Sequence, residues 1–337
     1  MPDTVESDLA KVLKGLPLDG NDEENCDFTL EEQNVALEAQ GIQPKIDPNF
    51  KPILGVTTTF IVAVVMLNEN NEVLMIQEAK KTCAGKWYLP AGRMEKQETI
   101  VMAAKREVLE ETGLEIECTS LLMIECAAGF WIRFVLTGKV LGGELKTPAR
   151  ADQESLQAKW IANIDELELR SSDIKHLIER ARAYKMARQI NDKGFHPDQL
   201  PALKPHTKML LRMVIVIKKK ASNRVHILIS EKNSWHLPTC EIHSMKNIHS
   251  SIRKFMVDLF GAEVPTHKLS GVLSVEHDPQ NDNDGLCLTM LVAFRNPLEE
   301  VPIIGKCVWH ETSKPLGDDL LKRLATKNST ILLHVYR

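Results

Sequence analysis

Several common signatures are missing from this sequence of 337 residues. Its seven cysteines are odd in number and contain no CxxC pair, which argues against a disulfide framework and against a zinc ribbon. The start, MPDTVESDLAKVL, has no basic stretch followed by an apolar one, so we expect no secretory signal. No apolar run approaches the roughly 20 residues that a membrane span requires. These absences predict a cytoplasmic or nuclear protein with reduced thiols and no membrane partner.

Charge and known nucleotide-binding motifs narrow the choice further. The net charge of -4 gives no sign of a general nucleic-acid binder, and we expect no obligatory nucleic-acid partner. No GxxxxGK[ST] run is present, so P-loop chemistry is not supported. The HxE and PCxxC elements of zinc deaminases are missing as well. The length is that of about two domains.

Composition divides the chain into four parts. We expect an acidic arm, a first domain, a linker and a second domain over residues 1–54, 55–190, 191–207 and 208–337, respectively. The arm crowds acids with few apolar neighbours, which predicts that it is mostly disordered apart from one amphipathic turn between Asp8 and Leu16. The linker carries Gly194 and three prolines.

The first domain has the pattern of a mixed α/β unit. Thr57–Leu67 and Glu72–Gln77 are β-branched and apolar, and the polar stretch between them predicts a β-hairpin. Further strands are predicted over Cys118–Cys126, Trp131–Val140 and Leu156–Ile161, followed by a helix that begins at Ser172.

The second domain repeats features of the first. Trp235-His-Leu-Pro238 follows Trp87-Tyr-Leu-Pro90 at a distance of 148 residues, which predicts a duplicated fold. The same offset replaces glutamates and the glycine of the first domain by residues that cannot bind a hard cation, so the second copy is predicted to be non-catalytic. Those replacements are Cys240 for Gly92, Lys246 for Glu98, Phe255 for Glu107 and Leu259 for Glu111. The copy could be a scaffold, a wall of the substrate site or a dimer surface.

The stretch Gly92–Leu114 carries the chemistry. It reads GRMEKQETIVMAAKREVLEETGL and predicts a helix that starts at Glu98 or Thr99 and ends before Gly113, because glycine tolerates the left-handed backbone after a helix.

On that helix Glu107, Glu110 and Glu111 share one face, with Arg106 beside them. The repulsion between these carboxylates and their position near the negative end of the helix dipole are both unfavourable. A divalent cation would remove both costs, and ligands that are all oxygen suit Mg²⁺ or Mn²⁺. An exposed acidic face is the competing interpretation, and the motif around the cluster argues against it.

These residues resemble, without a gap, the signature of the Nudix hydrolases: a glycine, five spacers, Glu, seven spacers, Arg-Glu-aliphatic, one spacer, Glu-Glu, one spacer and Gly-aliphatic. The resemblance implies an α/β/α sandwich with a mixed sheet that hydrolyses a phosphoanhydride with the help of metal. It implies four metal ligands, the Gly92 carbonyl, Glu107, Glu110 and Glu111, and three structural residues, Glu98, Arg106 and Gly113. It also places a base in the loop that contains Asp152 and Glu154, and we expect Glu154.

Three further segments resemble the 8-oxo-dGDP phosphatases of this family: Ile76–Ile100, Glu154–Trp160 and Asp284–Pro297. The resemblance implies Mg²⁺-dependent cleavage of 8-oxo-dGDP and 8-oxo-GDP to the monophosphate and phosphate, which cleanses the nucleotide pool. The candidates for contact with the base are apolar or aromatic residues of the predicted strands, and a role in the core is the alternative for each. They are Leu74, Ile76, Trp131 and Phe134.

Other substrates and another class of function stay open at this point. An ADP-ribose-like compound, a triphosphate or capped RNA is an alternative substrate, although the proline typical of ADP-ribose pyrophosphatases is absent near Ala128. A nucleotide- or RNA-binding regulator without turnover is the alternative of a different class.

Overall fold

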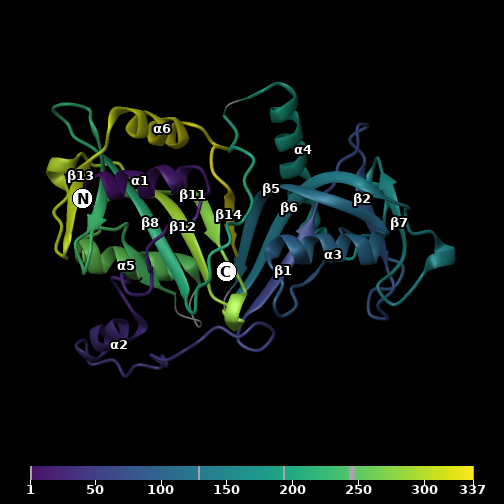
Figure 1. The fold of residues 1–337 in the computed structure, drawn as a ribbon, viewed down its shortest axis with the longest axis horizontal. Coiled ribbons are helices and arrows are strands. Elements are labelled where there is room, and N and C mark those ends of the chain that lie inside the picture. The colour runs from purple at the N-terminus through teal and green to yellow at the C-terminus, as the bar shows by residue number, and fades with distance from the viewer. Residues whose placement is uncertain (1, 128–129, 193, 243–246, 337) are drawn as a thin grey trace.

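Three β-sheets flanked by helices make up the computed structural model, which describes residues 2–127, 130–192, 194–242 and 247–336 (Figure 1). Ala128 and Lys246 lie outside these ranges. Within them, no helix is both long enough and apolar enough to cross a membrane.

The first half contains a five-stranded sheet in the order β14-β5-β6-β1-β4 and a three-stranded sheet in the order β3-β2-β7. Its elements are β1 (Thr59–Val64), β2 (Val73–Glu78), β3 (Trp87–Tyr88), β4 (Ala91–Arg93), α3 (Ile100–Thr112), β5 (Leu114–Ala127), β6 (Trp131–Gly143), β7 (Ser155–Ile161) and α4 (Lys175–Gln189). Strand β1 pairs in parallel with β6 and antiparallel with β4, so the sheet is mixed.

The predicted hairpin forms its turn, but its two strands part afterwards. The amide of Leu74 donates to the carbonyl of Met66 (3.1 Å), and that of Asn68 donates to Glu72 (3.1 Å). Beyond the turn, β1 joins the five-stranded sheet, whereas β2 pairs with β3 and β7. The sequence pattern of the strands cannot predict this separation, because either sheet would bury the same apolar side chains.

The second half repeats these pairings in a six-stranded sheet. Its elements are β8 (Met209–Lys218), β9 (Val225–Ser230), β10 (Thr239–Glu241), α5 (Ile248–Phe260), β11 (His267–Glu276), β12 (Leu286–Phe294), β13 (Cys307–Glu311) and α6 (Lys314–Ala325), and β14 (Leu332–Val335) follows. Strand β8 pairs antiparallel with β10 and parallel with β12, as β1 does with β4 and β6. Strand β9 pairs antiparallel with β13, as β2 does with β7. Helix α5 occupies the range of α3 shifted by 148 residues. The predicted α/β fold with mixed sheets and its repeat are therefore confirmed.

Helices cover both faces of the main sheets, which gives the sandwich its layers (Figure 1). Helices α3 and α5 lie on one side, and their buried apolar residues belong to one cluster that runs through both halves. On the opposite side, α4 packs on the first half, whereas α6 and the N-terminal helix pack on the second. The alternation at the end of β1 fits these layers, since Val64 belongs to the cluster shared with α3 and the next residue, Val65, to the one with α4.

The prediction of a mostly disordered arm is wrong. Two helices form there, α1 (Pro2–Leu13) and α2 (Leu30–Glu38), and Val5, Leu9 and Val12 are fully buried against the second half. The acids of the arm have partners, because Asp22 pairs with Lys204 and with Arg212 (2.7 Å). A crowded run of acids looks solvated in a sequence when the cations that neutralise it lie far along the chain.

The predicted linker and the boundary of the second domain also need correction. Gln199 accepts from the amide of Leu121 in the first half (2.8 Å), and Ala202 donates to Val275 in the second (2.8 Å), so this segment is packed between the halves. Strand β14 leaves the second half and pairs in parallel with β5, which extends the sheet of the first half.

Candidate active site

Helix α3 has the ends that its sequence predicts. Thr99 caps its start by accepting a hydrogen bond from the amide of Met102 (3.1 Å). Gly113 ends it in the left-handed region at a φ of 76°, and a side chain there would lie 2.3 Å from the carbonyl oxygen of Glu144. Ala104 and Val108 are fully buried, Glu107 and Glu111 lie next to them on the helix and are also buried, and Glu110 is exposed. Glu107 and Glu110 line a cleft on this face of the helix.

Arg106 is the centre of a charged network on that face. Its guanidinium donates twice to Glu98, through Nε to Oε1 (2.6 Å) and Nη2 to Oε2 (2.9 Å). Its Nη1 donates to Glu107 (2.9 Å) and Glu110 (3.1 Å), and Nη2 also reaches the carbonyl of Arg93 (3.0 Å). One arginine therefore ties the loop before the helix to two of the three clustered glutamates.

Strand β4 lies directly against the glutamates. The Glu111 carboxylate accepts a hydrogen bond from the amide of Ala91 (2.9 Å). A Cβ at Gly92 would lie 1.9 Å from Oε1 of Glu107, so any side chain there would force this carboxylate to move. Glycine at this position therefore leaves room for the Glu107 carboxylate beside the backbone.

Burial makes these carboxylates costly as anions. It raises the pKa of Glu111 to about 8, assisted by repulsion from Glu107 and opposed by the amide of Ala91. Burial also raises the pKa of Glu107, although its bond from Arg106 acts in the other direction. Three carboxylates and the Gly92 carbonyl form an oxygen-only donor set, which fits a hard divalent cation that would offset this cost.

The loop before β7 holds two acids in different settings. Asp152 is engaged, since both of its oxygens accept from Lys146 (2.9 and 2.8 Å) and it also accepts from the amide of Glu154 (3.0 Å). Within the described part of the chain, the Glu154 carboxylate has no hydrogen-bond or ion-pair partner, and it lines the cleft. Of the two, Glu154 is therefore the acid that is free to act on a ligand.

The cleft beside α3 has a volume of about 800 Å³. In addition to the acids, Trp131, Tyr88, Arg133 and Asp173 line it. The hydroxyl of Tyr88 donates to Asp173 (2.9 Å) and accepts from Arg133 (2.9 Å), and Arg133 also pairs with Asp173 (2.8 Å). Partial burial would raise the pKa of Asp173, but these donors bring it below its usual value, so the carboxylate stays ionised.

Two polar atoms of this group have no partner among the described residues. They are Nη2 of Arg133, a donor, and Oδ1 of Asp173, an acceptor. Arg133 is only 4% exposed, so an unmade hydrogen bond here is costly in the absence of a ligand.

The structure contradicts three of the four predicted contacts to the base. Leu74, Ile76 and Phe134 are 0% exposed and belong to the apolar core, so they cannot touch a ligand in the cleft. Both faces of β2 are covered, one by the sheet with α3 and the other by α4, which leaves no free face for a pocket. Trp131 alone lines the cleft.

The sequence carried signals for the residues that were missed. Glu125 and Arg133 each interrupt an apolar run, LLMIECA in β5 and WIRFVL in β6, and charged residues are seldom buried in such runs without a partner. Asp173 gave no such signal, because it lies in the polar first turn of a helix, where aspartate is common.

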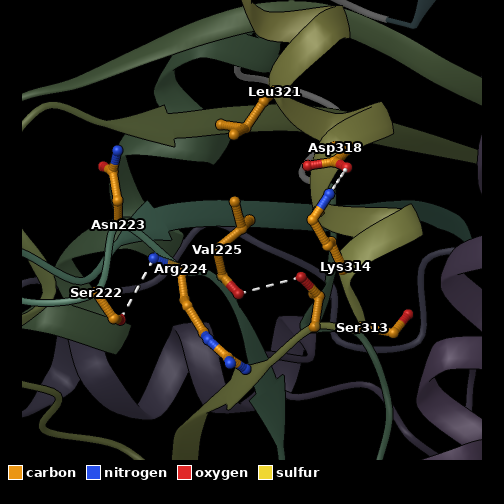
Figure 2. Close-up of a pocket in the computed structure, with 10 residues that line it drawn as sticks. Ser222, Asn223, Arg224, Val225, Ser313, Lys314, Asp318 and Leu321 are labelled. Carbon is orange, nitrogen blue, oxygen red and sulfur yellow. Dashed lines mark hydrogen bonds and ion pairs between the residues drawn. The ribbon is translucent and has the colours of Figure 1, made fainter.

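Two other places in the molecule could be mistaken for the site. A cavity of about 320 Å³ lies beside α6 in the second half. Figure 2 shows residues that line it. Its charged side chains already form ion pairs, Lys314 with Asp318 (3.0 Å) and Arg224 with Glu311. These charges therefore give no reason to assign a ligand to the cavity.

The other place is a buried trio in the second half. Among the described residues, His206, Glu276 and Cys287 are the three possible metal ligands whose ligand atoms lie within 4.8 Å of one another. Arg212 donates to both oxygens of Glu276 at 3.0 Å, so this carboxylate is neutralised and a cation would meet a guanidinium. We assign no metal to it. The carboxylate oxygens of the α3 glutamates lie farther apart than the ligand atoms of this trio, because Glu107 and Glu110 point to Arg106.

The arm covers the counterpart of the cleft in the second half. Phe255, at the position of Glu107, stacks on Phe28 of the arm at 6.2 Å, and Phe28 forms a bridge with Cys240. Asp27 donates through its amide to Thr239 (2.7 Å). The chain itself thus fills the place where the first half has an open cleft.

Comparison with known proteins agrees with the geometry. The profile of the NUDIX domain matches residues 57–181. The protein named 8-oxo-dGDP phosphatase NUDT18 from Mus musculus is 39% identical over 264 residues, which cover 76% of this chain and 79% of that protein. The chain belongs to the Nudix hydrolase family. Nudix enzymes typically require a divalent metal ion.

Other proteins are similar to this chain as well. The 8-oxo-dGDP phosphatase NUDT18 from Homo sapiens is 36% identical over 278 residues, covering 79% of this chain and 84% of that protein. A solved structure of a NUDIX hydrolase from Nitrosomonas europaea is 30% identical and covers 38% of this chain and 90% of its own, with a TM-score of 0.33.

Proposed function

We propose that this protein hydrolyses nucleoside diphosphates that carry an oxidised guanine, such as 8-oxo-dGDP and 8-oxo-GDP, in a reaction that depends on Mg²⁺ or Mn²⁺. Water attacks the terminal phosphorus and the P–O–P bond breaks, which gives the nucleoside monophosphate and inorganic phosphate. The observation that carries the proposal is one cleft lined by Gly92, Glu107 and Glu110, with Glu111 buried beside them, and by the two residues of the unmatched donor–acceptor pair.

The donor set supports the phosphate chemistry. Glu107, Glu110, Glu111 and the Gly92 carbonyl would hold the cation, which when bound neutralises diphosphate charge and activates water. Arg106 restrains two of these carboxylates and Glu98 restrains Arg106, so the set is held before a ligand arrives. Glu154 is the proposed base because it lines the cleft and has no partner among the residues that the structure describes, whereas Lys146 holds Asp152.

The donor–acceptor pair supports the choice of base. Guanine presents two acceptors on its N7–O6 edge. Oxidation at C8 places a hydrogen on N7, so the oxidised base presents a donor beside an acceptor. Oδ1 of Asp173 would accept from N7–H, and Nη2 of Arg133 would donate to the neighbouring carbonyl. In an unoxidised guanine N7 is an acceptor, so it would face the Asp173 carboxylate without a hydrogen between them, which disfavours binding. Trp131 offers an aromatic face to the purine.

A substrate panel tests the proposal. The wild type is assayed with Mg²⁺ on 8-oxo-dGDP, dGDP, 8-oxo-dGTP, ADP-ribose and capped RNA, and the products are identified. We expect the highest kcat/KM for 8-oxo-dGDP, with 8-oxo-dGMP and phosphate as products. Preference for another compound would redirect the substrate assignment, and binding without any turnover would favour the non-catalytic regulator.

Glu111→Gln is the matched variant for this panel. Glutamine keeps an oxygen that accepts from the amide of Ala91, so the fold should persist while one anionic ligand is lost. We expect kcat/KM to fall by at least about 100-fold. Rates near those of the wild type would show that the reaction does not use this carboxylate.

A further inference from the structure

The wall of the cleft that carries Trp131 and Arg133 is joined by a strand from the far end of the chain. Strand β14 follows α6 of the second half and pairs in parallel with β5, with His334 opposite Glu125 and Val335 opposite Cys126. Figure 1 shows β14 lying between β11 of the second half and β5 of the first. The second half therefore contributes an edge strand to the sheet of the catalytic half.

Tyr336, directly after this strand, touches the cleft wall in three ways. Its amide donates to the carbonyl of Cys126 (2.9 Å), which continues the ladder of β14. Its hydroxyl donates to Oε1 of Glu125 (2.8 Å). Its ring meets Trp131 edge to face, with 6.1 Å between the ring centroids. Burial, together with the bond to Glu125, raises the pKa of Tyr336 to about 12, so the phenol keeps its proton and donates.

Glu125 transmits this contact to the cleft. It is 0% exposed, and its other oxygen accepts from Nε of Arg133. Nε2 of His176 lies 2.8 Å from Oε1 of Glu125, the same oxygen that accepts from Tyr336. A buried carboxylate is held in place by its donors, so the position of Arg133 depends on how many donors fix Glu125.

We propose that Tyr336 is a positioning residue of the active site, through which the second half orients Trp131 and, by way of Glu125, Arg133. The identity of the ligand rests on the proposed function, but the coupling between Tyr336 and the cleft wall does not. A strand that merely covered a sheet edge would need no hydrogen bond to a fully buried carboxylate. This inference gives the non-catalytic half a part in recognition of the base.

Three variants separate the contacts. Tyr336→Phe keeps the ring against Trp131 and removes the bond to Glu125, whereas Tyr336→Ala removes both. Leu332→Ala is the matched control, because Leu332 lies on the same strand opposite Met123 and is 42% exposed.

Kinetics on 8-oxo-dGDP at saturating Mg²⁺ provide the first readout. We expect KM to rise about threefold to tenfold in Tyr336→Phe and more in Tyr336→Ala, with kcat within about twofold, because the glutamates of α3 are untouched. The control should match the wild type. Unchanged KM in both Tyr336 variants, or an equal fall of kcat with KM unchanged, would overturn the proposal.

Amide hydrogen exchange provides a second readout that needs no substrate. Tyr336→Ala should speed exchange in residues 122–127 and 130–136 relative to Leu332→Ala, while α3 exchanges as in the wild type, and Tyr336→Phe should lie between them. If the wild type does not act on 8-oxo-dGDP, this result still decides the coupling. Equal exchange in Tyr336→Ala and Leu332→Ala would refute it, whatever the substrate is.

Discussion

Gly92→Ala should separate catalysis from folding. The backbone of Gly92 is outside the left-handed region, so alanine adds no backbone strain. The new Cβ would lie 1.9 Å from Oε1 and 2.1 Å from Cδ of Glu107, and both are atoms at the end of a flexible side chain. The carboxylate must therefore move by about 1.5 Å to restore ordinary contact.

The size of the effect follows from this displacement. A misplacement of about 1 Å can lower an enzymatic rate by about 100-fold, so we expect kcat/KM to fall by this factor and the requirement for Mg²⁺ to increase. Stability should change little. The bond between Arg106 and Glu107 is lost, which costs about 1 kcal/mol or less for a partly exposed pair, while Arg106 keeps both bonds to Glu98.

Phosphate release over a range of Mg²⁺ concentrations measures the first effect, and the midpoint of thermal unfolding measures the second. Gly142→Ala is the control, because its Cβ would lie 3.9 Å from the nearest atom, Oε2 of Glu115, at an ordinary contact distance. A kcat/KM within about threefold of the wild type, with the same dependence on Mg²⁺, would refute the role given to Glu107.

Two further predictions concern stability. Phe28→Ala should lower the free energy of unfolding by about 3–5 kcal/mol, because Phe28 is buried on Phe255; a loss of less than about 1 kcal/mol on chemical denaturation would mean that the arm is not docked. Burial lowers the pKa of His196 to about 4, from its usual value of 6.5. Above pH 6.5 this shift does not affect the free energy of unfolding. As the pH falls from 6.5 toward 4, only the unfolded chain binds the proton, so the free energy of unfolding falls by up to about 3 kcal/mol. The drop in unfolding midpoint between pH 7.5 and 5 should therefore shrink in His196→Asn, and an equal drop in both proteins would contradict this assignment.

The glutamate face of α3 could be read from the residues alone. Helical spacing places Glu107, Glu110 and Glu111 together whatever the rest of the chain does, and Thr99 and Gly113 mark the ends by local hydrogen bonding and backbone freedom. The repeat was also readable, since it depends on matching segments in one order.

The wall that we propose to contact the base could not be read in this way. Tyr88, Arg133 and Asp173 lie 40 or more residues apart and meet because separate strands and a helix start converge on one cleft. Buried charges are tolerated only beside their partners, and a linear pattern does not say which distant partner that will be. For this reason we predicted apolar residues such as Leu74 as contacts to the base, whereas the structure places Leu74 in the hydrophobic core.

The arm and β14 show the same limit at a larger scale. The acids around Asp22 indicate a solvated segment until Lys204 and Arg212 are placed beside them. Four residues at Leu332–Val335 could extend either sheet, and the choice of β5 depends on which edge is free once both halves have packed. Local geometry therefore encodes the helix with the glutamate face, whereas long-range packing assembles the surface that would select the base.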